Sequence, residues 1–217
     1  MKRRQITLAV LILTALVLAG CKFQSATTIR PGGSGDLRTE VGFSAEERQN
    51  MEKQNPSSAQ DFCNAQASHP GNITVTEEKR GDETWCVTTA SFENLDQLRQ
   101  LYLQRKGIQI NRLEISGGTF YYDVSIDTSS RDSNFSGFTS MTWVLVLPDQ
   151  PITQNADEVE GNMLTWHLAP LSGVRNLNAE SKISQPLSVV VVEILILILI
   201  LGGGIYVALR QRKRAEN

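Results

Sequence analysis

The chain has 217 residues, 41% of them hydrophobic, which is enough for one folded domain between two apolar ends. Its formal net charge of −2 hides an uneven distribution, because residues 22–186 hold 14 Lys and Arg against 21 Asp and Glu, a net charge of −7. A domain with this charge and no run of basic side chains repels phosphate backbones, which argues against nucleic-acid binding.

The N-terminus is typical of a secretion signal. Three basic residues precede an apolar run, Leu8–Leu18, that has the length of a signal peptide's hydrophobic region. The run ends in Leu18-Ala19-Gly20-Cys21, the pattern of a bacterial lipobox, in which the Cys thiol accepts the lipid. We expect residues 1–20 to be the signal peptide and Cys21 to carry acyl chains such as palmitate. The alternative is an uncleaved signal anchor with a chance cysteine.

The segment that follows is polar and rich in glycine. We expect residues 21–35 to form a lipidated tether, in which a short strand around 24–30 remains an alternative, and residues 36–186 to form the extracytoplasmic domain. Spaced apolar side chains predict a strand at 37–43. Ser44 and Glu47 have the spacing of a capping box, which predicts a helix to about Gln54.

A second short helical piece is expected near Pro56, and strand patterns follow it from Asn72 onward. Alternating side chains at 73–76 and 85–88 predict a hairpin, with its turn at Arg80-Gly81-Asp82. This triplet also spells an integrin-binding tripeptide, but Gly-Asp is ordinary turn chemistry, so we favour the plain turn.

The best helical pattern lies at 95–106, where an apolar stripe recurs at helical spacing and Gly107 supplies the end. Further strands are expected at 108–115, 120–126, 141–147, 164–168 and 174–183. The predicted fold class is α+β: a mostly antiparallel sheet with one packed main helix on one face, plus a single C-terminal transmembrane helix.

The C-terminal segment Leu187–Leu209 predicts that membrane helix. Its 23 residues would extend about 34 Å, enough to cross a hydrocarbon core. The basic tail 210–217 follows directly, which predicts a cytoplasmic C-terminus. Glu193 interrupts the apolar run; it could pair with another helix, but we favour contact with headgroups or water near the outer surface. We therefore expect a cell-membrane protein, lipid-anchored and single-pass, with its main domain outside the cytoplasm.

The two remaining cysteines, Cys63 and Cys86, form a pair in an oxidising compartment. A disulfide between them would stabilise the fold by about 3 kcal/mol in the chain-entropy model. Two buried thiols are the alternative.

Catalytic and metal-binding patterns are missing from the sequence. The two histidines, His69 and His167, stand far apart, and there is no His-x-x-x-His, Cys-x-x-Cys or Gly-x-Ser-x-Gly motif. Carboxylates are scattered, so no glycosidase pair can be identified. We therefore expect no enzyme, no cofactor, no metal site and no catalytic residue, and the ligand-binding residues stay unknown.

Several of these features together resemble the LppM-like bacterial lipoproteins. They are the lipobox ending at Cys21, a Ser-Phe-Glu-Asn-Leu-Asp-Gln-Leu helix start at Ser91–Leu98, a Thr-Trp-His-Leu strand at Thr165–Leu168, and a terminal helix with a basic tail. The resemblance spans most of the chain and implies a cell-envelope domain with a role in binding lipids or glycolipids. It carries no ligand residues over to this sequence.

Two functions follow as hypotheses. The first is an envelope lipoprotein whose cleft between sheet and helix binds a lipid, glycolipid or other amphiphile, with neutral or sugar-rich headgroups favoured by the negative net charge. The second is a scaffold that recruits envelope protein partners. An envelope hydrolase is the weakest alternative.

Overall fold

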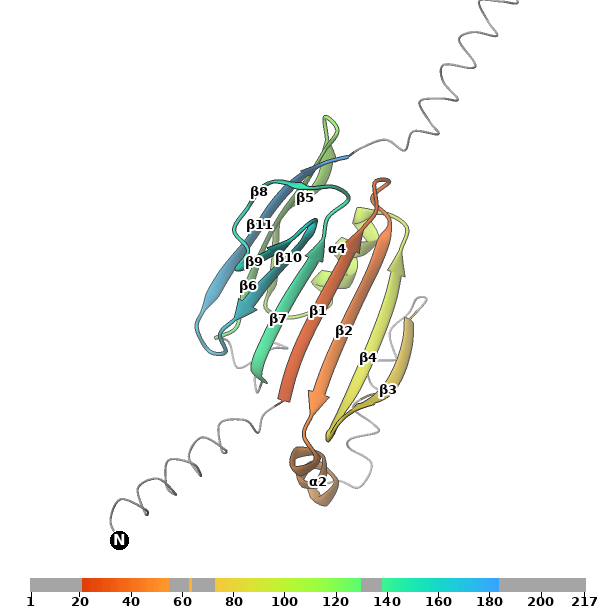
Figure 1. Cartoon of the computed structure of the whole chain (residues 1–217), viewed down its shortest axis with the longest axis vertical. Helices are drawn as coiled ribbons and strands as arrows, with labels where there is room; N and C mark the ends of the chain where they lie inside the picture. The colour runs from red at the N-terminus through yellow and green to blue at the C-terminus, as the bar shows by residue number, and fades with distance from the viewer. Residues whose placement is uncertain (1–20, 55–62, 64–72, 130–137, 184–217) are drawn as a thin grey trace, which may run out of the picture. The chain divides into compact units, whose positions relative to one another are not determined.

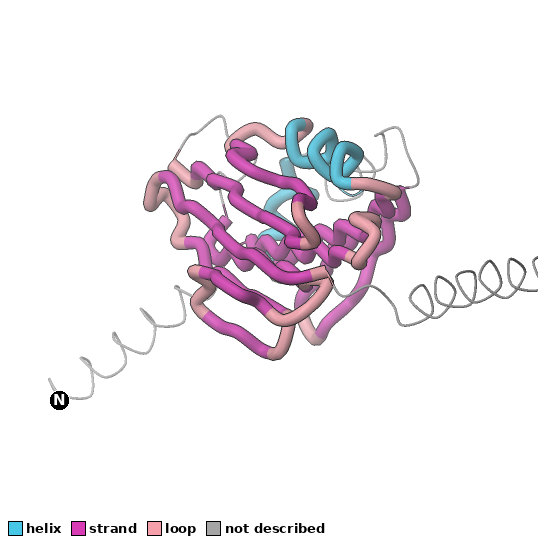
Figure 2. The backbone as a smooth tube through the Cα atoms, turned by 90° about the horizontal axis from the view of Figure 1, so that it is seen from above, coloured by secondary structure: helices cyan, strands magenta, loops and turns pink. Residues whose placement is uncertain are grey.

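Alternation of buried and exposed side chains runs through most of the chain, and the alternating segments form strands (Figure 1, Figure 2). The computed structural model describes residues 21–54, 63, 73–129 and 138–183. Its strands are β1 (Cys21–Ile29), β2 (Gly35–Phe43), β3 (Ile73–Arg80), β4 (Glu83–Phe92), β5 (Ile108–Ser116), β6 (Thr119–Asp127), β7 (Phe138–Val146), β8 (Pro151–Gln154), β9 (Glu158–Glu160), β10 (Met163–Leu168) and β11 (Val174–Lys182).

The described strands form two sheets. The large sheet has seven strands in the order β3-β4-β2-β1-β7-β10-β9, and the small sheet has four in the order β5-β6-β11-β8. Strand β1 pairs in parallel with β7, and the other pairings are antiparallel. The mostly antiparallel α+β fold is thus confirmed, but the expected single sheet is wrong. Alternation along a strand shows that one face is buried, not which strands share a sheet.

Two helices are described, α2 (Ala45–Gln54) and α4 (Leu95–Leu103). The predicted capping box opens α2: the Ser44 hydroxyl accepts from the Glu47 amide, and the Ser44 amide donates to the Glu47 carboxylate. The Asn94 side chain caps α4 by accepting from the amide of Gln97. Helix α4 ends three residues earlier than predicted.

The segment expected as a tether, 21–35, is instead part of the large sheet. Cys21 is the first residue of β1, and residues 30–34 form the turn into β2. Inward side chains of β1 alternate with half-buried ones: Phe23, Ser25, Thr27 and Ile29 are each at most 6% exposed. This face of the large sheet, which points toward α4 and the small sheet, is called the inner face below.

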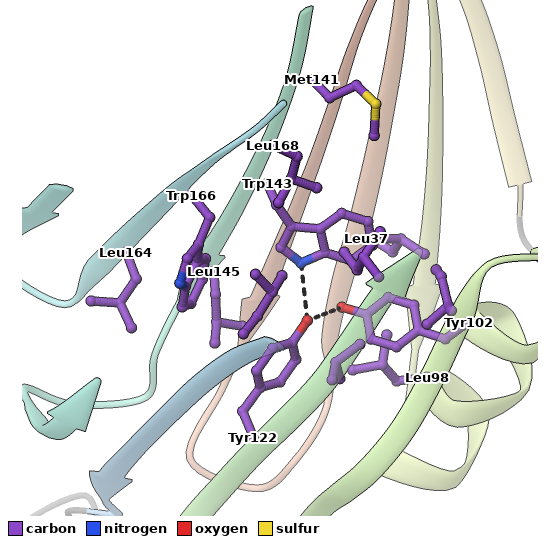
Figure 3. Packing of buried hydrophobic residues seen from close by; sticks show 14 of the residues in the cluster. Leu37, Leu98, Tyr102, Tyr122, Met141, Trp143, Leu145, Leu164, Trp166 and Leu168 are labelled. Atoms are coloured by element: carbon purple, nitrogen blue, oxygen red, sulfur yellow. Dashed lines mark hydrogen bonds between the residues drawn. The ribbon is translucent and has the colours of Figure 1, made fainter. Parts of the chain in front are cut away.

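The core between the layers contains a chain of hydrogen-bonded aromatic side chains (Figure 3). The Tyr102 hydroxyl lies 2.7 Å from Thr27 Oγ1 and 3.3 Å from the Tyr122 hydroxyl, which accepts a 2.9 Å hydrogen bond from Trp143 Nε1. Burial raises the pKa of both tyrosines. One residue of this network belongs to α4, one to the small sheet and two to the large sheet. The network therefore connects these three parts of the domain.

A disulfide joins Cys63 to Cys86 of β4, with the two Cα atoms 5.5 Å apart, in agreement with the pairing inferred from the sequence. Both cysteines are buried and belong to the core cluster. The bond therefore ties the chain between α2 and β3 to the inner face of the large sheet.

Loss of this disulfide should destabilise the domain. In the chain-entropy model, opening it frees the loop in the unfolded state and costs about 3 kcal/mol. Reduction of the wild type should lower the Tm in a thermal melt, whereas reductant should have no effect on the Cys63→Ala/Cys86→Ala double variant. An unchanged wild-type Tm in reductant would contradict the stabilising role.

Removal of the Tyr122 hydroxyl should cost stability because it leaves the buried Trp143 N–H without its acceptor. We expect Tyr122→Phe to lower the free energy of unfolding by about 1–3 kcal/mol. Tyr121→Phe is the matched control, since Tyr121 precedes it on β6 and is half-buried over Arg112; we expect a change of about 0.5 kcal/mol or less. Equal denaturant midpoints for the two variants would show that the network contributes nothing.

Candidate functional site

Cys21, the expected lipidation residue, starts the strand that lies in the middle of the large sheet. Its thiol is half-buried, and burial together with the nearby Glu47 carboxylate raises its pKa to about 11. The thiol is therefore uncharged at neutral pH. An acyl chain at this position would attach directly to the end of the sheet, with no tether between them.

The other anchor lies outside the described residues. Within the described ranges, no helix combines the length and apolar character needed to cross a bilayer. The Leu187–Leu209 segment, Glu193 and the tail 210–217 are not among them, and neither are residues 1–20, so the span and the signal remain predictions.

The histidine that the structure describes, His167, is exposed on β10 beside the fully buried Trp166, as expected for a simple strand residue. Its Nε2 lies 3.0 Å from Glu158 Oε1. Among the described residues, no group of three or more His, Cys, Asp or Glu side chains is arranged to hold a metal ion.

A surface groove of about 360 Å³ lies between α2 and the β3–β4 turn. Charged side chains of both signs line it, among them Arg48, Glu52, Lys79 and Asp82. Arg48 donates to Glu52, Glu77 and Thr84, so its charge is compensated. An open groove with this lining does not suit an acyl chain.

The outer face of the large sheet carries a buried carboxylate that is fully paired. Glu40 is 6% exposed and accepts hydrogen bonds from Arg80 at 2.7 and 3.0 Å and from Arg38 at 2.6 Å. These contacts, led by the hydrogen bond from Arg80, lower the pKa of Glu40. Arg80 also lies 4.8 Å from the centre of the Trp85 ring. The Arg80-Gly81-Asp82 triplet thus forms the predicted turn, and its arginine has a structural role.

The inner face contains a row of hydroxyl side chains across three strands. Ser25 of β1 is paired with Thr39 of β2, which is paired with Thr88 of β4, and all three are at most 9% exposed. We call these residues the hydroxyl row. Neighbours in such a row have Cβ atoms about 5 Å apart, so their side chains can act on one ligand.

Arg105 reaches this row from beyond the end of α4. Its Nη2 donates a 2.6 Å hydrogen bond to Thr39 Oγ1, while its Nη1 is buried and has no hydrogen-bond partner. Burial lowers the pKa of the Arg105 guanidinium, and the nearby Tyr102 raises it by a smaller amount. Ser25 Oγ is also buried without a partner.

An apolar row runs directly alongside. Strand register aligns Met141, Phe23, Val41 and Cys86 across β7, β1, β2 and β4, one step from the hydroxyl row toward Cys21. Each of them is at most 6% exposed. The inner face therefore carries a polar row beside an apolar one, and the four apolar side chains belong to the core cluster.

This location differs from the cleft expected between helix and sheet. At the contact of α4 with the sheet, Leu98 and Tyr102 are both 0% exposed and belong to the same core cluster as the apolar row. The candidate ligand-binding residues are instead Ser25, Thr39, Thr88 and Arg105. Their sequence signal is faint: alternation predicts that the hydroxyls face inward, but Arg105 looks like an ordinary basic residue near a helix C-terminus.

No protein-family model matches the sequence, and no curated protein matches it. Among solved structures, the chain is similar to the NMR structure of the folded domain of the Mycobacterium tuberculosis LppM protein, with 15% identity and a TM-score of 0.53. The match covers 78% of this chain and 94% of that one. At this identity the likeness concerns the fold alone. The domain therefore has an LppM-like fold, in line with the motif resemblance in the sequence.

Proposed function

We propose that the chain is a membrane-anchored cell-envelope lipoprotein whose outer domain binds a lipid, glycolipid or other amphiphile on the inner face of the large sheet, without turning it over. The observation that carries the proposal is the pair of adjacent rows on that face. Burial of an acyl chain along the apolar row would contribute about 0.8 kcal/mol per methylene, and the hydroxyl row with Arg105 would bind the polar head.

The positions of Cys21 and Ile183, at the two ends of the described domain, support lipid binding close to a bilayer. Cys21 lies at one end of β1, whereas the Ile183 amide donates to the Gly118 carbonyl at the β5–β6 turn. That turn lies near the other end of β1, since a Cβ built on Gly33 of the β1–β2 turn would be 3.2 Å from Ile115 of β5. The ends are thus separated by the length of β1, about 26 Å at 3.3 Å per residue. Anchors following from both ends would hold the domain close to the membrane surface.

A second function, the recruitment of an envelope protein, is favoured by two exposed apolar side chains, one in the β10–β11 loop and one at the start of β11. Leu171 is 71% exposed and Val174 is 69% exposed. Leu171 also has a φ of 57°, a conformation that costs a leucine free energy. A Leu171→Ser/Val174→Ser variant that lost a crosslinked neighbour in native membranes, while keeping its lipid, would support this scaffold function.

Lipid retention tests the amphiphile proposal. The full chain, extracted from bacterial membranes and exchanged into nonionic detergent, should keep a near-stoichiometric amount of an amphiphile that mass spectrometry of a solvent extract identifies. Val41→Thr should release most of it, because a hydroxyl in the apolar row disfavours an acyl chain.

The matched control is Val87→Thr. Val87 is as deeply buried, at 1% exposure, but lies on the outer face opposite Glu40. The two variants should lose similar stability in thermal melts, and only Val41→Thr should lose the lipid. Absence of any retained amphiphile in the wild type would refute the proposal and leave the scaffold function.

A further inference from the structure

Arg105 is a half-buried cation whose charge the described part of the chain does not neutralise. None of the ion pairs formed by the described residues includes it, and the hydrogen bond to Thr39 is made with a neutral hydroxyl. Its Nη1 is buried and has no partner. Unpaired buried charges are rare because the transfer of an ion out of water is strongly unfavourable.

The buried carboxylate of Glu40 is, by contrast, fully paired. On the outer face of the same sheet it is bound by both Arg38 and Arg80. Thr39 and Glu40 are consecutive residues that point to opposite faces of β2. Among the described residues, Arg105 thus differs from Glu40 in having no counter-charge.

A second unpartnered polar group lies in the same place. Of the three buried side-chain atoms without a partner among the described residues, two are Arg105 Nη1 and Ser25 Oγ. Ser25 is the cross-strand neighbour of Thr39, the residue that Arg105 contacts. The Arg105 guanidinium only donates hydrogen bonds and the Ser25 hydroxyl can donate one, so an acceptor with several lone pairs would satisfy both.

We propose that Arg105, with Ser25 and Thr39, forms an oxyanion site that binds the phosphate or carboxylate head of the amphiphile. This inference rests on the proposed function and specifies it. A guanidinium N–H that is left free pairs well with a phosphate or carboxylate oxygen, and the bond is strengthened by both charges. The apolar row beside the site would hold the attached chain. The net charge of −7 over residues 22–186 favours neutral headgroups, but the local positive charge of Arg105 at the inner face argues for anionic ones.

Three ligands separate the head from the chain: decyl phosphate, decanol and inorganic phosphate. Each is titrated into the full-length protein in one nonionic detergent, with tryptophan fluorescence and the Tm as readouts. Decyl phosphate should bind roughly tenfold or more tightly than decanol, since a charge-assisted hydrogen bond is made with the head. Inorganic phosphate should bind weakly because it lacks the chain.

Arg105→Met removes the charge and keeps most of the side-chain volume. We expect this variant to bind decyl phosphate no better than decanol, while its ligand-free Tm stays at or above that of the wild type, because an unpaired buried charge has been removed. Arg105→Lys should keep part of the preference. Lys106→Met, an exposed neighbour with the same change in net charge, should keep all of it.

Each other outcome overturns a defined part of the account. Equal binding of decyl phosphate and decanol by the wild type would refute the oxyanion site and leave the proposed function standing. No binding of either would refute the proposed function. Inorganic phosphate binding as tightly as decyl phosphate would assign the site to a free anion and remove the amphiphile. A fall in the ligand-free Tm of Arg105→Met with the preference intact would make Arg105 a structural residue.

Discussion

Strand β1 is the constraint on which the rest of the domain depends. It pairs with β2 on one side and with β7, 118 residues further along the chain at the Cys21–Thr139 contact, on the other. Without β1, the β2–β3–β4 half of the large sheet would have no bond to the β7–β10–β9 half. Because this strand begins at Cys21, a lipid at that residue and the inner face would belong to one rigid element.

The distribution of charge separates the two faces of that sheet. On the outer face the buried carboxylate of Glu40 is bound by two arginines, so its charge is compensated. On the inner face Arg105 and Ser25 retain unused hydrogen-bonding capacity beside an apolar row. A protein stabilised only by its own contacts would gain from an apolar residue at position 105. The retained cation is understandable if a bound ligand supplies the missing charge.

Local sequence rules predicted the local structure well. Patterns within a few residues predict the cap at Ser44, the hairpin around Gly81 and the strands from β4 to β7. The sequence of β1 predicts a tether, with a strand around 24–30 only as the alternative, because the segment is polar; even two of its inward residues, Ser25 and Thr27, interrupt the hydrophobic alternation. Ser25 belongs to the candidate site and Thr27 to the aromatic network. The polar side chains that hide the strand pattern therefore both have roles in the interior. Contacts distant in sequence determine the division into two sheets, the short exposed strands β8 and β9, and the hydrogen bond of Arg105 to Thr39.

The central claim is that an amphiphile occupies the inner face of the large sheet. Photocrosslinking tests it most directly: the full-length protein in detergent is irradiated with an alkyl phosphate that carries a photoreactive group on its chain, and the labelled peptides are mapped by mass spectrometry. The account predicts label on the inward residues of β1, β2 and β7, such as Phe23, Val41 and Met141, and its loss on competition with unlabelled decyl phosphate. Label confined to the outer face or to residues 187–209, unaffected by the competitor, would contradict it.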